Sequence, residues 1–274
     1  MNNKTFHVGG SIDKAMKGES ELQAFAVLQE AWRITAKNFI SFFPAVVGLF
    51  LAQAALLLVA LQVQLGSANV FFDTIIGGGE IPLSVINAGY MANFWSDVLS
   101  APLYVGVTLM SLNHAVGLPS KPSHLVKGLP FALISIVTVL LTSSLQQIGS
   151  TLFPFLGIAL LMGLSMTIIL ICEKRVSPLK AIQYSLVATF RKLLPITAVY
   201  IVILTMFIIC FAALNIFIPL AIACLIWTIP FYFNVKAIIY RNLFGITLQV
   251  TTIKHGKDDG DYSEKKDDPN VFNA

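Results

Sequence analysis

Residues 193–214 read LLPITAVYIVILTMFIICFAAL, and residues 217–239 read FIPLAIACLIWTIPFYFNVKAII, so two long apolar stretches follow one another late in the chain. A helix needs about 20 mostly apolar residues to cross a bilayer, and each stretch is long enough for one crossing. Only residues 215–216 lie between them. We therefore predict two neighbouring membrane-spanning helices, Leu193–Leu214 and Phe217–Ile239.

The composition of the whole chain is that of a membrane protein. Of its 274 residues, 56% are hydrophobic and 12% are charged, and the mean hydropathy is +0.79. A soluble domain has about 25% charged residues, which cover its surface. A bilayer solvates apolar side chains directly and removes that need. The formal net charge of +4 is too small to indicate a nucleic-acid partner.

Four further stretches upstream have the length and composition of spans. They are Phe39–Leu65, Phe94–Val116, Leu129–Ile148 and Thr151–Cys172. The second of these is the least defined, because Asn87, Asn93 and Asp97 interrupt its apolar run. We interpret residues 81–93 as an interfacial or re-entrant approach to this span, and its outer boundary stays open.

The positions of the basic residues predict the orientation. All eighteen lysines and arginines fall before the first span, in residues 117–128 and 173–192, or from the end of the last span onward. The alternate connections contain none. Cytoplasmic loops carry the excess of Lys and Arg in membrane proteins. We therefore predict six spans with both termini in the cytoplasm.

The prolines indicate an internal repeat of three hairpins. Pro130 and Pro154 have the same separation as Pro195 and Pro219, whereas Pro44 and the corresponding Pro102 are much farther apart. Proline suits the first turn of a helix, where its missing N–H is not needed. We interpret the pattern as three paired spans, with an insertion outside the membrane in the first pair. The alternative is that prolines mark helix starts without any repeat.

Amphipathic helices are expected before the first and third hairpins, lying along the inner leaflet. The helix before the third hairpin begins at Ser177-Pro178 and carries a stripe of small and apolar residues. Five basic residues around it are candidate contacts for anionic lipid headgroups: Lys174, Arg175, Lys180, Arg191 and Lys192. The alternative is a topology signal without lipid specificity. The domain organisation that follows is a cytoplasmic N-terminal segment 1–38, a membrane domain 39–245, and a disordered charged tail 246–274.

The sequence contains few groups that could perform chemistry. His114 and Asp97 lie near opposite ends of the second span, too far apart to act together. Cys172, Cys210 and Cys224 lie in apolar stretches without the spacing of a metal site or a disulfide framework. No hydrolase, zinc-protease or nucleotide-binding motif is present. We predict no catalytic residue, no cofactor and no metal, and a protein that is not an enzyme.

Polar side chains within the spans give a weaker signal. Asn113, His114, Thr228 and Asn234 are the candidates for lining a polar cavity. Such groups also make ordinary hydrogen bonds between helices. The segment 66–97, expected outside, carries acidic and aromatic residues and no base.

Two stretches resemble a known group of proteins. One is Glu173–Pro195, with a basic pair, Ser-Pro and a later Arg-Lys, and the other is Pro230 with Ala237–Gly245. This pattern resembles six-span bacterial inner-membrane proteins of the YciC-type family, and also the membrane domain fused to some glycerophosphodiester phosphodiesterases. The resemblance implies a bacterial inner-membrane location and a six-span fold. It transfers no functional residue, and the fused catalytic domain is not in this chain.

Two functions remain open from the sequence. The first is a non-enzymatic membrane protein in envelope or lipid homeostasis, or a membrane partner subunit. The alternative is a small-molecule transporter or channel, because internal repeats are common in transporters. Against transport, no span shows an obvious break apart from Pro230. A polar cavity between the helices would favour transport, and a solid apolar core would favour the first function.

Overall fold

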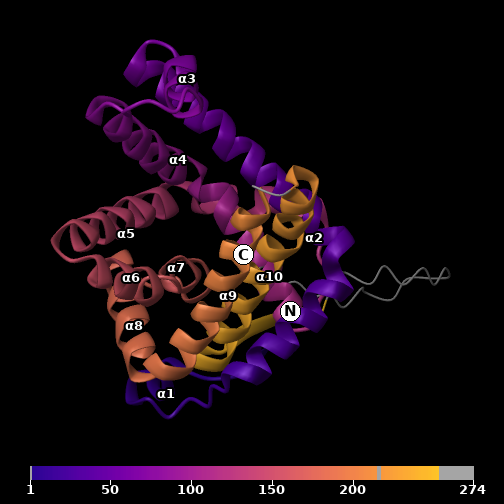
Figure 1. Ribbon diagram of the computed structural model, residues 1–274. Helices are drawn as coiled ribbons and strands as arrows, with labels where there is room; N and C mark the ends of the chain where they lie inside the picture. The colour runs from indigo at the N-terminus through magenta and orange to yellow at the C-terminus, as the bar shows by residue number, and fades with distance from the viewer. Residues whose placement is uncertain (1, 215–216, 253–274) are drawn as a thin grey trace.

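The computed structural model describes residues 2–214 and 217–252, and these residues form an all-α protein with one additional pair of strands (Figure 1). In chain order the elements are β1 (Asn2–Val8), α1 (Ile12–Lys17), α2 (Ala24–Leu65), α3 (Ala68–Ile76), α4 (Leu83–Ala115), the 3-10 helix η1 (Pro122–Phe131), α5 (Ala132–Leu152), α6 (Pro154–Gly163), α7 (Thr167–Lys174), α8 (Pro178–Arg191), α9 (Leu193–Leu214), α10 (Ile218–Phe244) and β2 (Ile246–Thr252). The predicted all-α class is confirmed.

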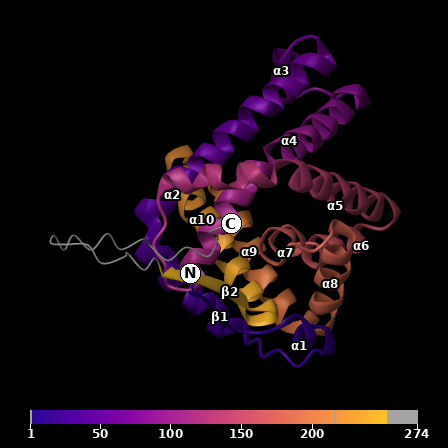
Figure 2. The same ribbon diagram turned by 180° about the vertical axis from the view of Figure 1, so that it is seen from behind.

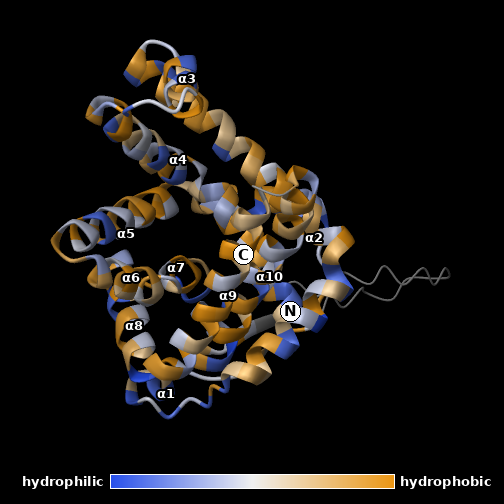
Figure 3. Cartoon of the chain, viewed as in Figure 1, coloured by the Kyte–Doolittle hydropathy of each residue, from blue (hydrophilic) through white to orange (hydrophobic). Residues whose placement is uncertain are grey.

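Five helical segments in the described part of the chain are long and apolar enough to cross a membrane. They are Ala24–Leu65, Pro122–Leu152, Pro154–Lys174, Leu193–Ala213 and Ile218–Phe244. Their outward faces are apolar in Figure 3, with side chains such as Val63 and Leu133 largely exposed. Because exposed apolar faces of this kind suit lipid, the helices indicate a membrane protein. The predicted second span, now within α4, is not among the five.

The long helix α2 combines two segments that the sequence analysis separated. It has 42 residues, about 63 Å at 1.5 Å per residue, twice the thickness of a bilayer core. It continues without interruption through the expected boundary at residues 38 and 39. Pro44 lies inside α2 and Pro102 inside α4, so neither is in a first turn as predicted. Pro154 and Pro219 do begin α6 and α10, as the pattern of the second and third pairs requires.

The predicted span Thr151–Cys172 is two helices, because the chain leaves the helical path between Gly163 and Thr167. A buried serine from α8 compensates for the break. The Oγ atom of Ser185 donates to the carbonyl of Gly163 at 2.5 Å and accepts from the backbone N–H of Met166 at 3.3 Å. Unpaired backbone groups are costly in an apolar environment, so this side chain makes the broken helix tolerable.

The main core surrounds the C-terminal half of α10, and α10 packs against α2, α4 and α9. Its buried residues include Ile239, Leu243 and Phe244, all fully inaccessible. The 3-10 helix η1 approaches α4 at backbone contact, because a Cβ atom on Gly128 would overlap the carbonyl of Pro102. By contrast, α3 and the adjoining ends of α2 and α4 project away from the other helices (Figures 1 and 2).

The two strands join the beginning of the chain to its end. β1 pairs antiparallel with β2, from Asn2 opposite Thr252 to Val8 opposite Ile246 (Figure 2). The turn after β1 packs closely on the end of α10, where the Gly10 N–H donates to the Arg241 carbonyl at 3.0 Å. Residues 246–252 therefore differ from the disordered tail predicted from residue 246. The rest of that predicted tail, 253–274, lies outside the described residues.

Candidate functional site

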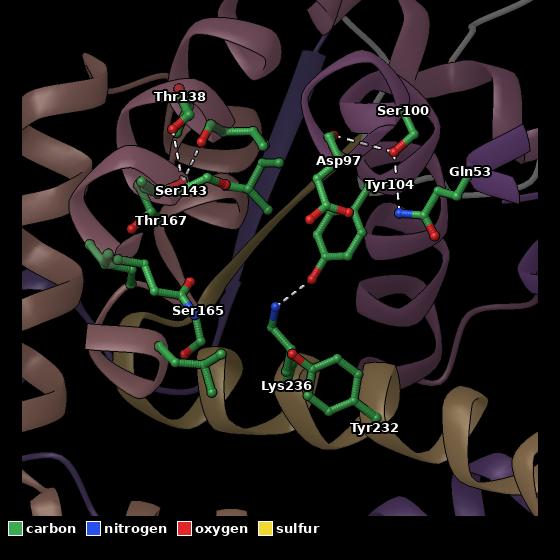
Figure 4. A pocket seen from close by; sticks show the side chains of 16 residues that line it. Gln53, Asp97, Ser100, Tyr104, Thr138, Ser143, Ser165, Thr167, Tyr232 and Lys236 are labelled. Atoms are coloured by element: carbon green, nitrogen blue, oxygen red, sulfur yellow. Dashed lines mark hydrogen bonds between the residues drawn. The ribbon is translucent and has the colours of Figure 1, made fainter. Parts of the chain in front are cut away.

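A polar cavity of about 290 Å³ lies between α4, α5, α7 and α10 (Figure 4). Hydroxyl, amide and charged groups from α2, α4, α5, α7, α10 and the turn between α6 and α7 line it together with apolar side chains. The polar lining residues are Gln53, Asp97, Ser100, Tyr104, Thr138, Thr142, Ser143, Gln146, Ser165, Thr167, Tyr232 and Lys236. Such a concentration of polar groups between apolar helices distinguishes this space from ordinary packing defects, which are apolar.

A second space of about 550 Å³ adjoins the first, because both are lined by Asp97, Ser143 and Gln146. It extends toward the N-terminal half of α4 and the C-terminal end of α5, where Asn93 and Ser150 contribute polar groups. Asp97 thus stands where the two spaces meet. The arrangement provides a polar path from the wider space to the cavity.

Lys236 is the most distinctive residue of the cavity. Its side chain comes from α10 and is 4% exposed. The Nζ atom donates to the Tyr104 Oη atom at 2.6 Å and lies 5.2 Å and 5.3 Å from the ring centroids of Tyr104 and Tyr232. Aromatic faces at this distance attract a cation. Among the described residues no carboxylate forms an ion pair with Lys236, and after Tyr104 and Tyr232 its ammonium group has one further N–H to donate.

The sequence analysis assigned Lys236 to the end of the last span, with the other cytoplasmic basic residues. The structure instead places it inside α10, two turns before the helix ends, and facing the cavity. A sequence signal for this position does exist. Tyr232 and Lys236 are one helical turn apart, so they share a face of the helix, and apolar residues follow them.

Asp97 is the acidic residue of the cavity. It is half-buried in α4, and one of its oxygens accepts a hydrogen bond from Asn93 Nδ2 at 3.3 Å. Tyr104 follows it by two helical turns and therefore lies on the same face of α4. The cavity thus contains one acid and one base from different helices, and they do not pair with each other.

Two hydrogen bonds join α2 to α4 near Asp97. Gln53 Nε2 donates to Ser100 Oγ at 3.2 Å, and Ser96 Oγ donates to the Gln53 carbonyl at 2.7 Å. Figure 4 shows the Gln53–Ser100 contact at the edge of the cavity, next to Asp97. These bonds fix the position of the α4 residues that face the cavity.

The break between α6 and α7 forms the opposite wall. Ser165 lies in the break and Thr167 begins α7, and both line the cavity. Thr167 is 1% exposed, and its Oγ1 atom is buried without a hydrogen-bond partner in the described part of the protein. Buried hydroxyls are normally paired, so this group is an exception at the cavity wall.

The four residues predicted to line a polar cavity do not line this one. His114 and Asn234 do meet, with Nδ1 and Oδ1 3.4 Å apart, and Asn234 Nδ2 donates to Thr35 Oγ1 at 2.9 Å. His114 Nε2 also contacts Ser120 Oγ at 2.5 Å. This buried network ties α2, α4 and α10 together. The other two lie apart from it: Thr228 contacts Cys210 at 3.4 Å, and Asn113 is buried in α4.

The predicted headgroup contacts are only partly exposed. Arg175, Lys180 and Arg191 are exposed around α8, and Lys192 is half-buried. Lys174 is turned toward the protein, with Nζ 3.0 Å from Glu173 Oε1 and 3.2 Å from Thr247 Oγ1. The predicted helix itself is confirmed as α8, with Ser177 as its N-cap and Pro178 in its first turn. Contact with lipid remains a prediction.

The residues that carry the family resemblance have structural partners. Glu173 accepts from Tyr240 Oη at 2.7 Å and from the Thr247 N–H at 2.9 Å. Arg241 forms a two-pronged ion pair with Glu30, both contacts being 2.8 Å. These bonds connect α7, α2 and the start of β2 to the end of α10, and none of the residues lines the cavity.

Within the described residues, no group of three or more His, Cys, Asp and Glu lies close enough to hold a metal ion. Comparison with known proteins adds no assignment: no family model matches the chain, and neither a curated protein nor a solved structure is similar to it. The resemblance to YciC-type proteins therefore stays a prediction.

Proposed function

We propose that this protein is a six-span inner-membrane protein that binds and transports a small polar solute through the cavity around Lys236. The observation that carries the proposal is a buried lysine that has no acidic partner in the described part of the chain and lies in a polar cavity between apolar helices. Ionisable groups at membrane depth are costly and are retained where they serve a solute pathway.

The pairing of the chain ends supports six crossings. Val8 lies opposite Ile246 in the ribbon of β1 and β2, so the chain between them begins and ends at one place. A two-stranded ribbon leaves backbone groups open at its edges and belongs outside the hydrocarbon core. The chain must then cross an even number of times. Five helices meet the apolar criterion, and α4, with 33 residues, is long enough to provide the sixth crossing.

The polar character of α4 is consistent with that role. A helix that faces a cavity on one side exposes less of its surface to lipid and tolerates polar residues there. Asp97, Ser100 and Tyr104 all line the cavity. The same residues lower the hydropathy of α4, which is why a cavity-lining span is hard to identify by composition.

The turn between α6 and α7 weakens the argument against transport, although most of its backbone groups stay hydrogen-bonded within the helix. Transporters commonly form their solute sites at discontinuous helices, whose freed backbone and side-chain groups face the solute. Here the break after Gly163 brings Ser165 and Thr167 to the cavity. The Ser185 side chain of α8 bonds the Gly163 carbonyl and the Met166 N–H, so these two bonds stabilise the interruption.

We also propose that the protein is not an enzyme. Hydroxyl groups of the cavity donate to backbone carbonyls, as Thr138 does to Ile134 at 2.7 Å and Ser165 to Met162 at 2.6 Å. A nucleophilic hydroxyl needs an adjacent base to activate it. Binding and release of a solute require only the polar contacts that the cavity offers.

Uptake into proteoliposomes tests the transport proposal. The full chain is reconstituted and supplied with a panel of labelled amino acids, amines, carboxylates, phosphate esters and sugars. We expect uptake of at least one class above empty vesicles, reduced at least tenfold by Lys236→Met and unchanged by Lys17→Met, an exposed lysine in α1. Equal uptake by empty vesicles for every class would overturn the proposal, as would uptake that does not depend on Lys236.

A role in lipid homeostasis is the second candidate, favoured by the exposed basic residues around α8. Arg175, Lys180 and Arg191 would hold anionic headgroups at the cytoplasmic surface. Native mass spectrometry of the protein with a mixture of anionic and zwitterionic lipids tests this. Charge reversal by Lys180→Glu and Arg191→Glu should lower the retained anionic lipid. If retention does not change, the basic residues act only on topology.

A further inference from the structure

We infer that the solute is a small zwitterion, with its anionic group at Lys236 and its cationic group at Asp97. The inference rests on the proposed binding function and adds the chemical class of the ligand. It follows from the two opposite charges that one cavity holds apart.

The Lys236 end is suited to an anion. One N–H of the ammonium group is used by Tyr104, and the rings of Tyr104 and Tyr232 flank the charge. Tyr232 is a second side-chain partner of the ammonium group, so one N–H remains for a carboxylate or phosphate, with which a charge-assisted hydrogen bond is strong. The buried Thr167 hydroxyl has no partner in the described residues and lines the same cavity, where it supplies a further polar contact.

The Asp97 end is suited to a cation. The carboxylate receives one side-chain hydrogen bond, from Asn93, although two oxygens can accept about four. Of the lysines and arginines that the structure describes, Lys236 alone lines either of the two adjoining spaces. An ammonium group placed here would also reach the side chains of Ser143 and Gln146, which line both spaces.

The two charges line one cavity without pairing with each other, which favours one molecule that contacts both. Lys236 and Asp97 form no ion pair with each other, and Tyr104 stands two helical turns from Asp97, about 10 Å along α4 at 1.5 Å per residue. A ligand with only a negative charge would leave the Asp97 carboxylate without an opposite charge. A ligand with only a positive charge would leave the Lys236 ammonium without one. A zwitterion neutralises both, which removes the cost of two unpaired charges away from water.

The cavity is large enough for a small solute. A volume of about 290 Å³ is roughly that of ten molecules of liquid water at about 30 Å³ each. Short amino acids and phosphoethanolamine fit within it. The headgroup of an ethanolamine phospholipid carries the same two charges, so the experiment needs to separate a free solute from a lipid.

Binding by the purified full chain in a lipid-free detergent tests the inference, with heat of binding as the signal. The probes are β-alanine, γ-aminobutyrate and phosphoethanolamine, with propionate and propylamine as their single-charge counterparts. We expect the best zwitterion to bind at least tenfold more tightly than either counterpart. Asp97→Asn should reduce its affinity to that of propionate, and Lys236→Met should reduce it to that of propylamine.

Matched variants show that the effect belongs to the cavity. Asp73→Asn and Lys17→Met remove the same charges from exposed positions in α3 and α1 and should change nothing. Lys236→Arg keeps the positive charge and should retain part of the affinity, so a failure of Lys236→Met to fold leaves the test intact. Addition of dispersed ethanolamine phospholipid distinguishes the source: competition with phosphoethanolamine at lower concentration indicates the headgroup, and its absence indicates the free solute.

The outcomes separate this inference from the proposed function. If propionate binds as tightly as any zwitterion and Asp97→Asn has no effect, the site takes a simple anion and the inference is overturned while solute binding stands. Lys236-dependent binding of a sugar or amine alone overturns it in the same way. If no solute of any class binds or is transported, the proposed function itself fails.

Discussion

The Nζ atom of Lys236 in α10 lies 2.6 Å from the Oη atom of Tyr104 in α4, although 132 positions separate the two residues in the chain. This bond places the positive charge of α10 against the cavity face of α4. It also joins two helices that carry most of the charged and aromatic lining. Such groups can stabilise the fold or bind a solute, and substitutions distinguish the two roles.

Lys236→Met distinguishes a functional lysine from a structural one. Methionine has a similar volume and removes an ammonium group that lacks an acidic partner among the described residues. A buried charge without an opposite charge carries a desolvation cost, and an apolar side chain of similar volume removes that cost. We therefore expect an equal or higher midpoint of thermal unfolding in detergent, with solute binding lost. A fall of the midpoint well below that of Lys17→Met would show that the lysine stabilises the fold.

Ser185→Ala should destabilise the protein by about 2–6 kcal/mol, because it leaves two backbone groups at the α6–α7 break without partners and each buried unpaired group costs about 1–3 kcal/mol. Chemical denaturation in detergent measures the change. Ser177→Ala is the matched control, since Ser177 is exposed and makes no capping bond through its side chain. Equal stability of the two variants would contradict the role assigned to Ser185.

Gly128→Ala should destabilise by about 1–3 kcal/mol, the usual cost of forcing extra atoms into a packed site. A Cβ atom there would overlap the Pro102 carbonyl and come within 2.6 Å of the Gly106 nitrogen. Gly79→Ala is the control, because a Cβ at Gly79 meets nothing within 4 Å. If both variants unfold at the wild-type temperature, η1 does not rest on α4 as closely as the structure shows.

Cysteine labelling in intact cells tests the crossing number. In a background with Cys172, Cys210 and Cys224 replaced by alanine, Gly79→Cys and Lys17→Cys are compared using a maleimide that cannot cross membranes. Six crossings with cytoplasmic ends place residue 79 outside and residue 17 inside. We expect labelling of Gly79→Cys alone, and of both after the cells are opened. Labelling of Lys17→Cys in intact cells would reverse the orientation.

Much of the architecture was predictable from local sequence. The apolar stretches 193–214 and 218–239 form α9 and most of α10, and Ser177-Pro178 begins α8. Helix length and the capping residues depend on neighbours in the chain, so a local pattern carries them. The continuity of α2 through residue 38 was missed because an amphipathic stretch and an apolar span have different compositions but the same backbone hydrogen bonding.

The cavity was decided only by the tertiary structure. Asn234 and Lys236 lie in the same two turns of α10, yet Asn234 bonds Thr35 and His114, while Lys236 faces the cavity with Tyr104. Composition does not distinguish their two faces, because the partner of a polar side chain is selected by which helix packs against that face. The same holds for Ser185, whose partners at the break come from a different helix.

The sequence by itself thus determined that the chain forms apolar helices of membrane-spanning length, because the solvation of a helix by lipid depends on its own residues. The packing of those helices decided where a polar cavity remains, that the span 151–172 is broken, and that the chain ends pair through Val8 and Ile246. Each of these features needs groups from distant segments, and it is their burial against one another that leaves Lys236 facing Tyr104 without a carboxylate partner among residues 2–214 and 217–252.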